Sequence, residues 1–351
     1  MKYRSIIFLA IIILGISTVA LAQKTAPSNG AANGLRLAKQ LPESDGILLL
    51  DVKRLFADAL PQILSGNQPM LEEVVNHADK IKALTGIDIK QFDRIAIGTT
   101  IKPISTKEVD LSPVVLAEGK YTAESLLSAV KLASNGSYRE ERAGGKTLYI
   151  FTPKLENLPA GATAKPDNSF IGGMIGRAMK GILSHEIAVS PLNATTVAFG
   201  PVSRVKQTVE GANRAGLTLL SLPGLQRGGI GSFGAKLPSG LSGLLGYDLD
   251  ELGKSINSVK YLSGWIDLEG GNTVVRAIAK TTLASDAEDL FLTLQDLQAL
   301  GKALLGGSKG ADKQVYGRLI DGLKFTRAGN ELTIDLQVPQ SDINVLIGEK
   351  K

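Results

Sequence analysis

Val259–Leu283, with the sequence VKYLSGWIDLEGGNTVVRAIAKTTL, is the stretch that decides the fold class. Two strand-like runs flank Gly270-Gly271, and a Gly-Gly pair between such runs is typical of a tight β-hairpin. Since hairpins join antiparallel strands and no regular βαβ alternation is visible, the chain is predicted to be α+β, with antiparallel sheets and helices packed on one face. Three more strand pairs are expected: Tyr138–Arg142 with Lys146–Phe151, Glu186–Ser190 with Thr195–Phe199, and Leu323–Thr326 with Glu331–Val338.

Apolar residues at helical spacing separate these strands. Asp51 is placed to cap a helix, which Pro61 should kink or divide. Further helices are expected at Pro69–Ile81, Thr122–Ala133 and Pro201–Glu210, and from Ser285 to Leu305.

Both halves of the chain read as strand, helix, strand pair, helix and hairpin, which favours an internal duplication. Leu237-Pro238 with Gly243-Leu244-Leu245 echoes Leu41-Pro42 with Gly46-Ile47-Leu48. The predicted segments are a signal peptide at 1–22, a flexible leader at 23–34, a first α+β half at 35–222 with an inserted loop and amphipathic helix at 153–183, a Gly-rich connection at 223–242, a second α+β half at 243–340 and a C-terminal tail at 341–351.

The N-terminus predicts export. Lys2 and Arg4 precede an apolar run from Ile6 to Val19, and Ala20-Leu21-Ala22 has the form of an A-x-A cleavage site. We therefore expect a periplasmic or extracellular protein, with an uncleaved inner-membrane tether as the alternative. The chain has no cysteine, which excludes disulfides, thiol catalysis and a lipid-modified cysteine.

Charge and composition argue against nucleic acid as a partner. The formal net charge is only +5, basic and acidic residues are interleaved, and aromatic residues make up 5% of the chain. Nucleic-acid binding normally needs a concentrated basic face.

No cofactor is predicted, because each match to a known binding or catalytic motif lacks the strand or helix that the motif requires beside it. Gly229–Gly234 matches G-x-G-x-x-G, but Leu237-Pro238 follows too soon for the helix that a dinucleotide site needs. We expect this motif to be a loop. Gly306–Gly310 matches a nucleophile elbow but follows a helix end rather than a strand. Gly145-Lys146-Thr147 lies in a hairpin and lacks the earlier glycine of a phosphate loop.

Neither a metal site nor a catalytic set is predicted. His77 and His185 are the only histidines, and His185 with Glu186 would point to opposite faces of a strand. Glu118 and Glu269 end comparable strands of the two halves and could converge if the halves face each other. A periplasmic hydrolase using carboxylates and His185 is therefore the alternative function.

The segment 170–183 is the candidate for partner binding. Its apolar residues line one helical face, while Arg177, Lys180 and four glycines lie elsewhere. Such a segment either docks on the protein's own sheet or offers an adaptable surface to a protein or membrane partner. The candidate binding residues are Phe170, Ile171, Met174, Ile175, Met179 and Ile182.

Three stretches resemble uncharacterised exported bacterial proteins over roughly residues 41–150. They are Leu41–Asp45 with the following apolar strand and Asp51, Leu84–Asp88, and the Phe92–Gly98 strand. The resemblance implies no known activity or ligand. With no assembled catalytic set, the sequence favours an exported envelope protein that binds or scaffolds a partner without being an enzyme; its oligomeric state is not predicted.

Overall fold

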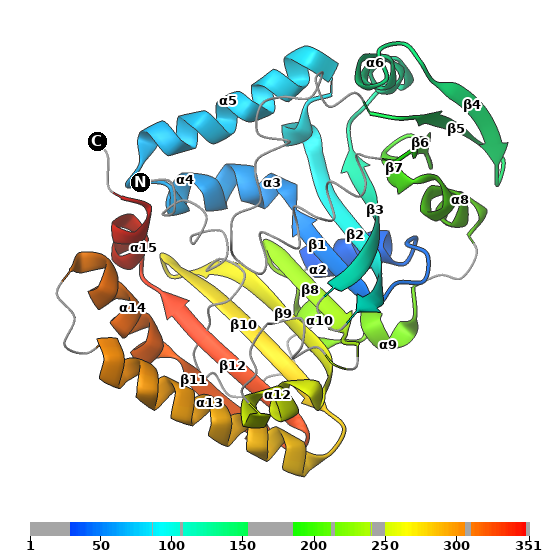
Figure 1. Ribbon diagram of the computed structural model, residues 1–351. Helices are drawn as coiled ribbons and strands as arrows, with labels where there is room; N and C mark the ends of the chain where they lie inside the picture. The colour runs from blue at the N-terminus through cyan, green and yellow to red at the C-terminus, as the bar shows by residue number, and fades with distance from the viewer. Residues whose placement is uncertain are drawn as a thin grey trace.

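The computed structural model describes residues 29–85, 87–105, 108–153, 185–211, 215–238, 240, 250–305 and 310–348. Its centre is one antiparallel sheet of twelve strands, in the order β11-β12-β10-β9-β8-β1-β2-β3-β7-β6-β5-β4 (Figure 1). The α+β class predicted from the hairpins is confirmed, and the strands form one sheet. The signal peptide predicted at 1–22 lies outside the described residues.

The strand order repeats on the two sides of the central β1–β8 pair. Strands β1 to β3 lie side by side and a hairpin, β4–β5, forms the outer edge; β8 to β10 and the hairpin β11–β12 mirror them. The first side has an additional hairpin, β6–β7. The strands are β1 Gly46–Asp51, β2 Phe92–Ser105, β3 Glu108–Gly119, β4 Arg139–Ala143, β5 Lys146–Phe151, β6 Ile187–Pro191, β7 Thr196–Pro201, β8 Gly231–Lys236, β9 Val259–Glu269, β10 Asn272–Thr281, β11 Lys324–Ala328 and β12 Glu331–Val338.

This order fits two similar halves, and the duplication itself stays a prediction. The structural counterpart of β1 is β8, which ends just before Leu237-Pro238. The second-half strand predicted at Gly243-Leu244-Leu245 lies outside the described residues.

The glycine pairs make the predicted hairpins. Gly144 and Gly145 have φ values of 52° and 73°, and Gly270 and Gly271 have 56° and 81°. Two successive residues with positive φ form the tight turn whose twist matches paired strands. All four hairpins predicted from the sequence are confirmed.

Helices cover both faces of the sheet rather than one. Successive β1 side chains show the reason: Leu49 joins the core on one face and Leu50 the core on the other. The first face carries α2 (Asn29–Ala38), α8 (Val202–Glu210), α9 (Leu217–Leu220) and α10 (Pro223–Arg227). The second face carries α3 (Val52–Arg54), α4 (Leu60–Ile63), α6 (Ala123–Ala133), α13 (Ala284–Leu305), α14 (Ala311–Gly322) and α15 (Gln340–Ile347). Helix α5 (Gln68–Thr85) packs on α6, and α12 (Asp250–Asn257) packs on α13.

The local helix signals are confirmed at Asp51 and Pro61. The Asp51 carboxylate accepts a hydrogen bond of 3.0 Å from the Arg54 amide, capping α3. A π-helical turn at Leu55–Ala59 then separates α3 from α4, whose first turn contains Pro61. None of the helices in the described residues is both long and apolar enough to cross a bilayer.

The prediction that Gly229–Gly234 is a loop was wrong. Residues Gly231–Lys236 form β8, between β1 and β9 at the centre of the sheet. Glycine fits closely there: a Cβ on Gly234 would lie 3.0 Å from the side chains of Leu222 and Leu225, which would have to shift. The stretch predicted as a Gly-rich connection therefore contains α10 and a central strand.

The folded region also extends further toward both termini than predicted. Helix α2 begins at Asn29, inside the expected flexible leader, and its Gly34 lets Leu49 approach closely. Helix α15 occupies most of the expected C-terminal tail, where Ile343, Leu346 and Ile347 are buried.

Candidate functional site

The apolar face predicted for partner binding cannot be placed. Its six residues, like the rest of 154–184, lie outside the described part of the chain: Phe170, Ile171, Met174, Ile175, Met179 and Ile182.

The two carboxylates proposed to converge do not meet. Glu118 and Glu269 lie on β3 and β9, which are separated by four strand spacings, or roughly 19 Å. Glu118 is buried beneath α2 and forms an ion pair with Arg36. Glu269 forms a separate ion pair, with 3.4 Å between its Oε1 atom and Arg227 Nη2. In the described residues, no group of three or more His, Asp or Glu side chains could hold a metal ion.

Glu118 belongs to a polar row that crosses the sheet beneath α2. Arg94 faces Asp51 on one side and Glu118 on the other, and Thr196 follows on β7. Glu118 Oε2, Thr196 Oγ1 and Arg94 Nε are buried without a hydrogen-bond partner. The hollow beside Asp51 and Arg94 has only ≈ 20 Å³, which is the size of one water molecule rather than of a substrate.

His185 lies exposed before β6, beside a paired carboxylate. Its neighbour Glu186 forms two contacts with Arg139, one of them 3.0 Å between Nη2 and Oε2. The hydrogen bond from Arg139 lowers the pKa of Glu186. A hollow of ≈ 410 Å³ opens beside the pair. A carboxyl group with a lowered pKa is a poor general acid at neutral pH, so this hollow does not favour the hydrolase alternative.

We expect Arg139→Gln to raise the pKa of Glu186 toward the ordinary value, because the guanidinium stabilises only the ionised carboxylate. A pKa lowered in the folded state contributes stability above the unfolded value, about 4.3, and loses it as the pH falls through the folded value. Acid titration of the Glu186 carboxyl carbon by NMR checks this. Arg142→Gln, on the same strand, is the control; equal titration in both variants would contradict the assignment.

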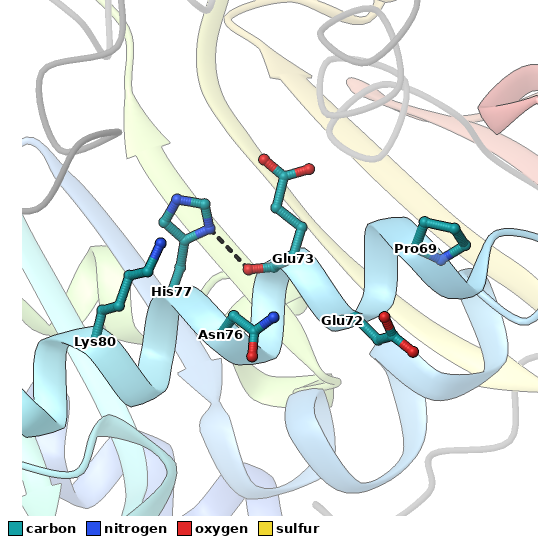
Figure 2. Close-up of a pocket in the computed structure, with 6 residues that line it drawn as sticks. All are labelled: Pro69, Glu72, Glu73, Asn76, His77 and Lys80. Atoms are coloured by element: carbon teal, nitrogen blue, oxygen red, sulfur yellow. Dashed lines mark hydrogen bonds between the residues drawn. The ribbon is translucent and has the colours of Figure 1, made fainter.

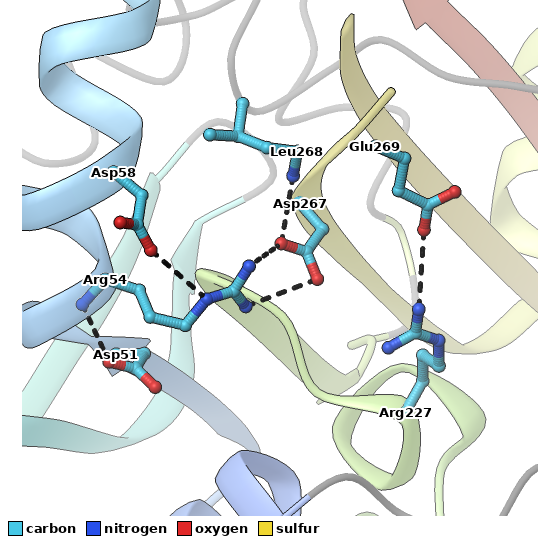
Figure 3. Close-up of polar contacts among 7 residues, drawn as sticks. All are labelled: Asp51, Arg54, Asp58, Arg227, Asp267, Leu268 and Glu269. Atoms are coloured by element: carbon cyan, nitrogen blue, oxygen red, sulfur yellow. Dashed lines mark hydrogen bonds and ion pairs between the residues drawn. The ribbon is translucent and has the colours of Figure 1, made fainter. Parts of the chain in front are cut away.

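A second charged cluster joins the two halves of the sheet. Arg54 on α3 reaches Asp267 on β9, with 2.6 Å between Nη2 and Oδ1, and Asp58 lies 3.9 Å from Arg54 Nε (Figure 3). The hydrogen bond to Asp267 raises the pKa of Arg54. Asp267 also accepts a 2.9 Å bond from the Leu268 amide. With these partners the cluster ties the halves together rather than offering a free acid or base.

The hollow along α5 is a groove on a polar helix surface. It has ≈ 400 Å³, and its described lining residues follow one side of α5 (Figure 2). The Nδ1 atom of His77 lies 2.7 Å from the backbone oxygen of Glu73, one turn earlier, as the figure shows. One ring nitrogen of His77 thus contacts the backbone of its own helix, on the exposed side of α5. The lining residues are Pro69, Glu72, Glu73, Asn76, His77 and Lys80.

On the first face of the sheet, a smaller cavity lies at the edge of the area that α9 and α10 cover. It has ≈ 210 Å³ between these helices and strands β9, β10 and β12. Its lining combines hydroxyls, three apolar residues and one ion pair: Thr218, Ser221, Leu222, Pro223, Tyr261, Ser263, Ile278, Lys280 and Glu331.

Within the described part of the chain, four of the exposed leucines lie on α13, along one border of the molecule (Figure 1). Leu292, Leu297, Leu300 and Leu304 have exposed fractions of 50%, 38%, 55% and 69%. The helical spacing of 285–305 predicts this helix but not its exposed leucines. The available signal was that Leu290 and Leu292, two residues apart on a helix, point to opposite sides, so one buried face cannot contain both.

Comparison with known proteins gives a fold likeness at low identity. No family model matches the chain, and no curated protein matches its sequence. The solved structure of TP0453, a Treponema pallidum protein, in crystal form I covers 89% of this chain and 96% of its own, with 10% identity and a TM-score of 0.40. In crystal form IV the figures are 91%, 99%, 11% and 0.42.

Proposed function

We propose that this chain is an exported, non-enzymatic binding protein that captures a protein partner on the leucine face of α13, defined as Leu292, Leu297, Leu300 and Leu304. The exposure of these four leucines carries the proposal. Single exposed apolar residues are common on soluble proteins, but four exposed leucines on one helix are more than scattered exposure and favour an interaction surface. Export rests on the signal-peptide pattern of residues 1–22.

The spacing of the leucines suits a helical partner. Leu292, Leu300 and Leu304 fall in one row at four-residue spacing, and Leu297 lies beside it. Fully burying one leucine contributes about 1.5–3 kcal/mol, and these side chains are about half exposed. Burying the exposed parts of the four leucines would contribute roughly 3–6 kcal/mol before the cost of association, so charged contacts around the face have to add to it.

The charges around this face favour a basic partner. Asp296 occupies the remaining position of the row, between Leu292 and Leu300. Asp289 lies three residues before Leu292 on the same helix. Neither aspartate forms an ion pair within the described ranges. We therefore infer a partner helix with Lys or Arg beside its apolar residues. Acidic side chains in the row argue against an anionic lipid surface, which attracts basic helices.

The segment 170–183 supports the same kind of activity. Its apolar residues line one predicted helical face, with Arg177 and Lys180 elsewhere, so we propose that it offers a second apolar surface to a partner. This role remains part of the proposal, alongside the α13 face.

A photoreactive residue at position 300 tests the proposal in the native envelope. We expect crosslinks to one protein through a segment that carries basic and apolar residues. Asp296→Lys should reduce those crosslinks by at least about fivefold, because it places like charges opposite each other. The yield is measured by quantitative mass spectrometry of the crosslinked peptides.

Leu217 provides the matched control, because it is 81% exposed on α9, away from α13. The same photoreactive residue at 217 should not capture this partner. Equal capture at both positions, or crosslinks at 300 to lipid alone, would overturn the proposed site.

A further inference from the structure

We propose that the cavity between α9, α10 and strands β9, β10 and β12 binds a small neutral polyhydroxylated compound. The cavity lies on the first face of the sheet, whereas α13 packs on the second, so this site is independent of the partner surface proposed above. The inference rests on the size of the cavity, its hydrogen-bonding groups and its balance of charge.

The size limits the ligand to a small molecule. A volume of ≈ 210 Å³ equals about seven water molecules at liquid density. A polyol or sugar of about three to six carbons fits this space, whereas a nucleotide or a lipid does not.

The lining offers hydroxyl groups at different depths. Ser263 is the deepest, only 1% exposed, and its Oγ accepts a long bond of 3.4 Å from the Gly224 amide. No acceptor among the described residues takes the Ser263 hydroxyl proton. Tyr261 lies two residues away on the same face of β9, and the Ser221 hydroxyl donates to the Thr218 backbone oxygen, which leaves its own oxygen able to accept.

The charged lining residues neutralise each other. Lys280 Nζ lies 2.8 Å from Glu331 Oε1 on the adjacent strand. The pair has no net charge, and it keeps N–H donors on Lys280 and oxygen acceptors on Glu331, which suits a ligand hydroxyl because that group both donates and accepts. An anionic or cationic ligand would find no net opposite charge in this lining. The neutral class is therefore favoured.

The remaining wall is apolar. Leu222, Pro223 and Ile278 line the cavity beside the hydroxyls. A sugar or polyol has the same mixed character, with C–H groups on one side and hydroxyls on the other. Ligand sites typically combine an apolar wall with a few convergent polar groups in this way.

The chain contains its own reporter of binding. Trp265 is the only tryptophan, and it lies on β9 two residues after Ser263, on the same face. The Arg276 guanidinium stacks 5.1 Å above its ring, and Ile278, two residues after Arg276, lines the cavity. A ligand in the cavity should therefore change the emission of Trp265.

Titration of the mature protein with glycerol, ribose, glucose and myo-inositol tests the proposal, by calorimetry and by Trp265 emission. We expect saturable binding of at least one of these probes. Ser263→Ala should weaken it about five- to tenfold, the effect of one buried hydrogen bond, and Tyr261→Phe should also weaken it. Thr333→Val, beside Ile278 on β12 but outside the lining, should leave affinity unchanged.

Three outcomes would overturn the proposal. One is the absence of saturable binding by every probe in a protein with normal Trp265 emission. Another is equal affinity of wild type, Ser263→Ala and Tyr261→Phe. The third is tighter binding of glutamate or phosphate than of any neutral probe. None of these bears on crosslinking at position 300, so the two proposals can fail separately.

Discussion

Replacing Arg204 by alanine is expected to lower the free energy of unfolding by about 3 kcal/mol. Arg204, on α8, is 5% exposed and reaches into the turn that precedes β1. Its Nη1 donates to the Glu43 backbone oxygen at 2.8 Å and its Nη2 to Ser44 Oγ at 3.0 Å. Alanine leaves a cavity and removes the donor that satisfies the Glu43 oxygen. Urea denaturation followed by circular dichroism measures the loss.

Burial lowers the pKa of Arg204, so part of its favourable bonding offsets the cost of placing a cation there. Lys206→Ala is the control on the same helix, where Lys206 pairs with Glu141 at a partly exposed position. We expect that change to cost less than about 1 kcal/mol. Equal losses in the two variants would show that the turn does not depend on Arg204.

This arginine gives a physical meaning to Leu41–Asp45, one of the stretches singled out in the sequence. The Ser44 hydroxyl donates to the Pro42 backbone oxygen, and the Asp45 carboxylate accepts from the Ile101 amide. The motif is thus a turn whose polar groups are bonded to β2 and α8. Sequence reasoning found the motif but not its partner, because Arg204 lies 160 residues from Ser44.

Features determined by neighbouring residues were predictable. Each predicted hairpin needs only a turn and two flanking strands, and Asp51 caps α3 through a residue three positions later. Strand β8 was not predictable in the same way. Its sequence, GSFGAK, has two glycines, which read as a loop until Leu222 and Leu225 are packed on Gly234. Among the described residues, glycine marks close packing at Gly224 and Gly234 as well as turns at Gly144 and Gly270.

The candidate sites depend even more on long-range packing. The helix containing Leu300 and Leu304 was predicted, but which leucines stay exposed depends on where α12 and α14 pack. The cavity beside Ser263 combines residues from 218 to 331, and no local pattern announces it. The converse holds for Glu118 and Glu269, whose equivalent places in the repeat suggested proximity, although each pairs with its own arginine.

Gly224→Ala is expected to destabilise the protein by about 3 kcal/mol, near the upper limit for overpacking. A Cβ at this position of α10 would lie 2.2 Å from the Gly264 amide nitrogen and 2.7 Å from its oxygen. Both belong to the backbone of β9, in the middle of the sheet, so the helix has to move away. Alanine favours a helix over glycine by about 1 kcal/mol, which is too little to offset this clash.

The displacement should be visible in two measurements. The melting temperature should fall by roughly 5–10 °C, and Trp265 emission should shift to the red as α10 retreats from β9. Gly216→Ala is the matched control, because Gly216 lies just before α9 and a Cβ there would meet nothing within 4 Å. The control should melt like wild type. If Gly224→Ala also melts like wild type, α10 can shift without cost, and the wall it gives to the cavity is not rigid.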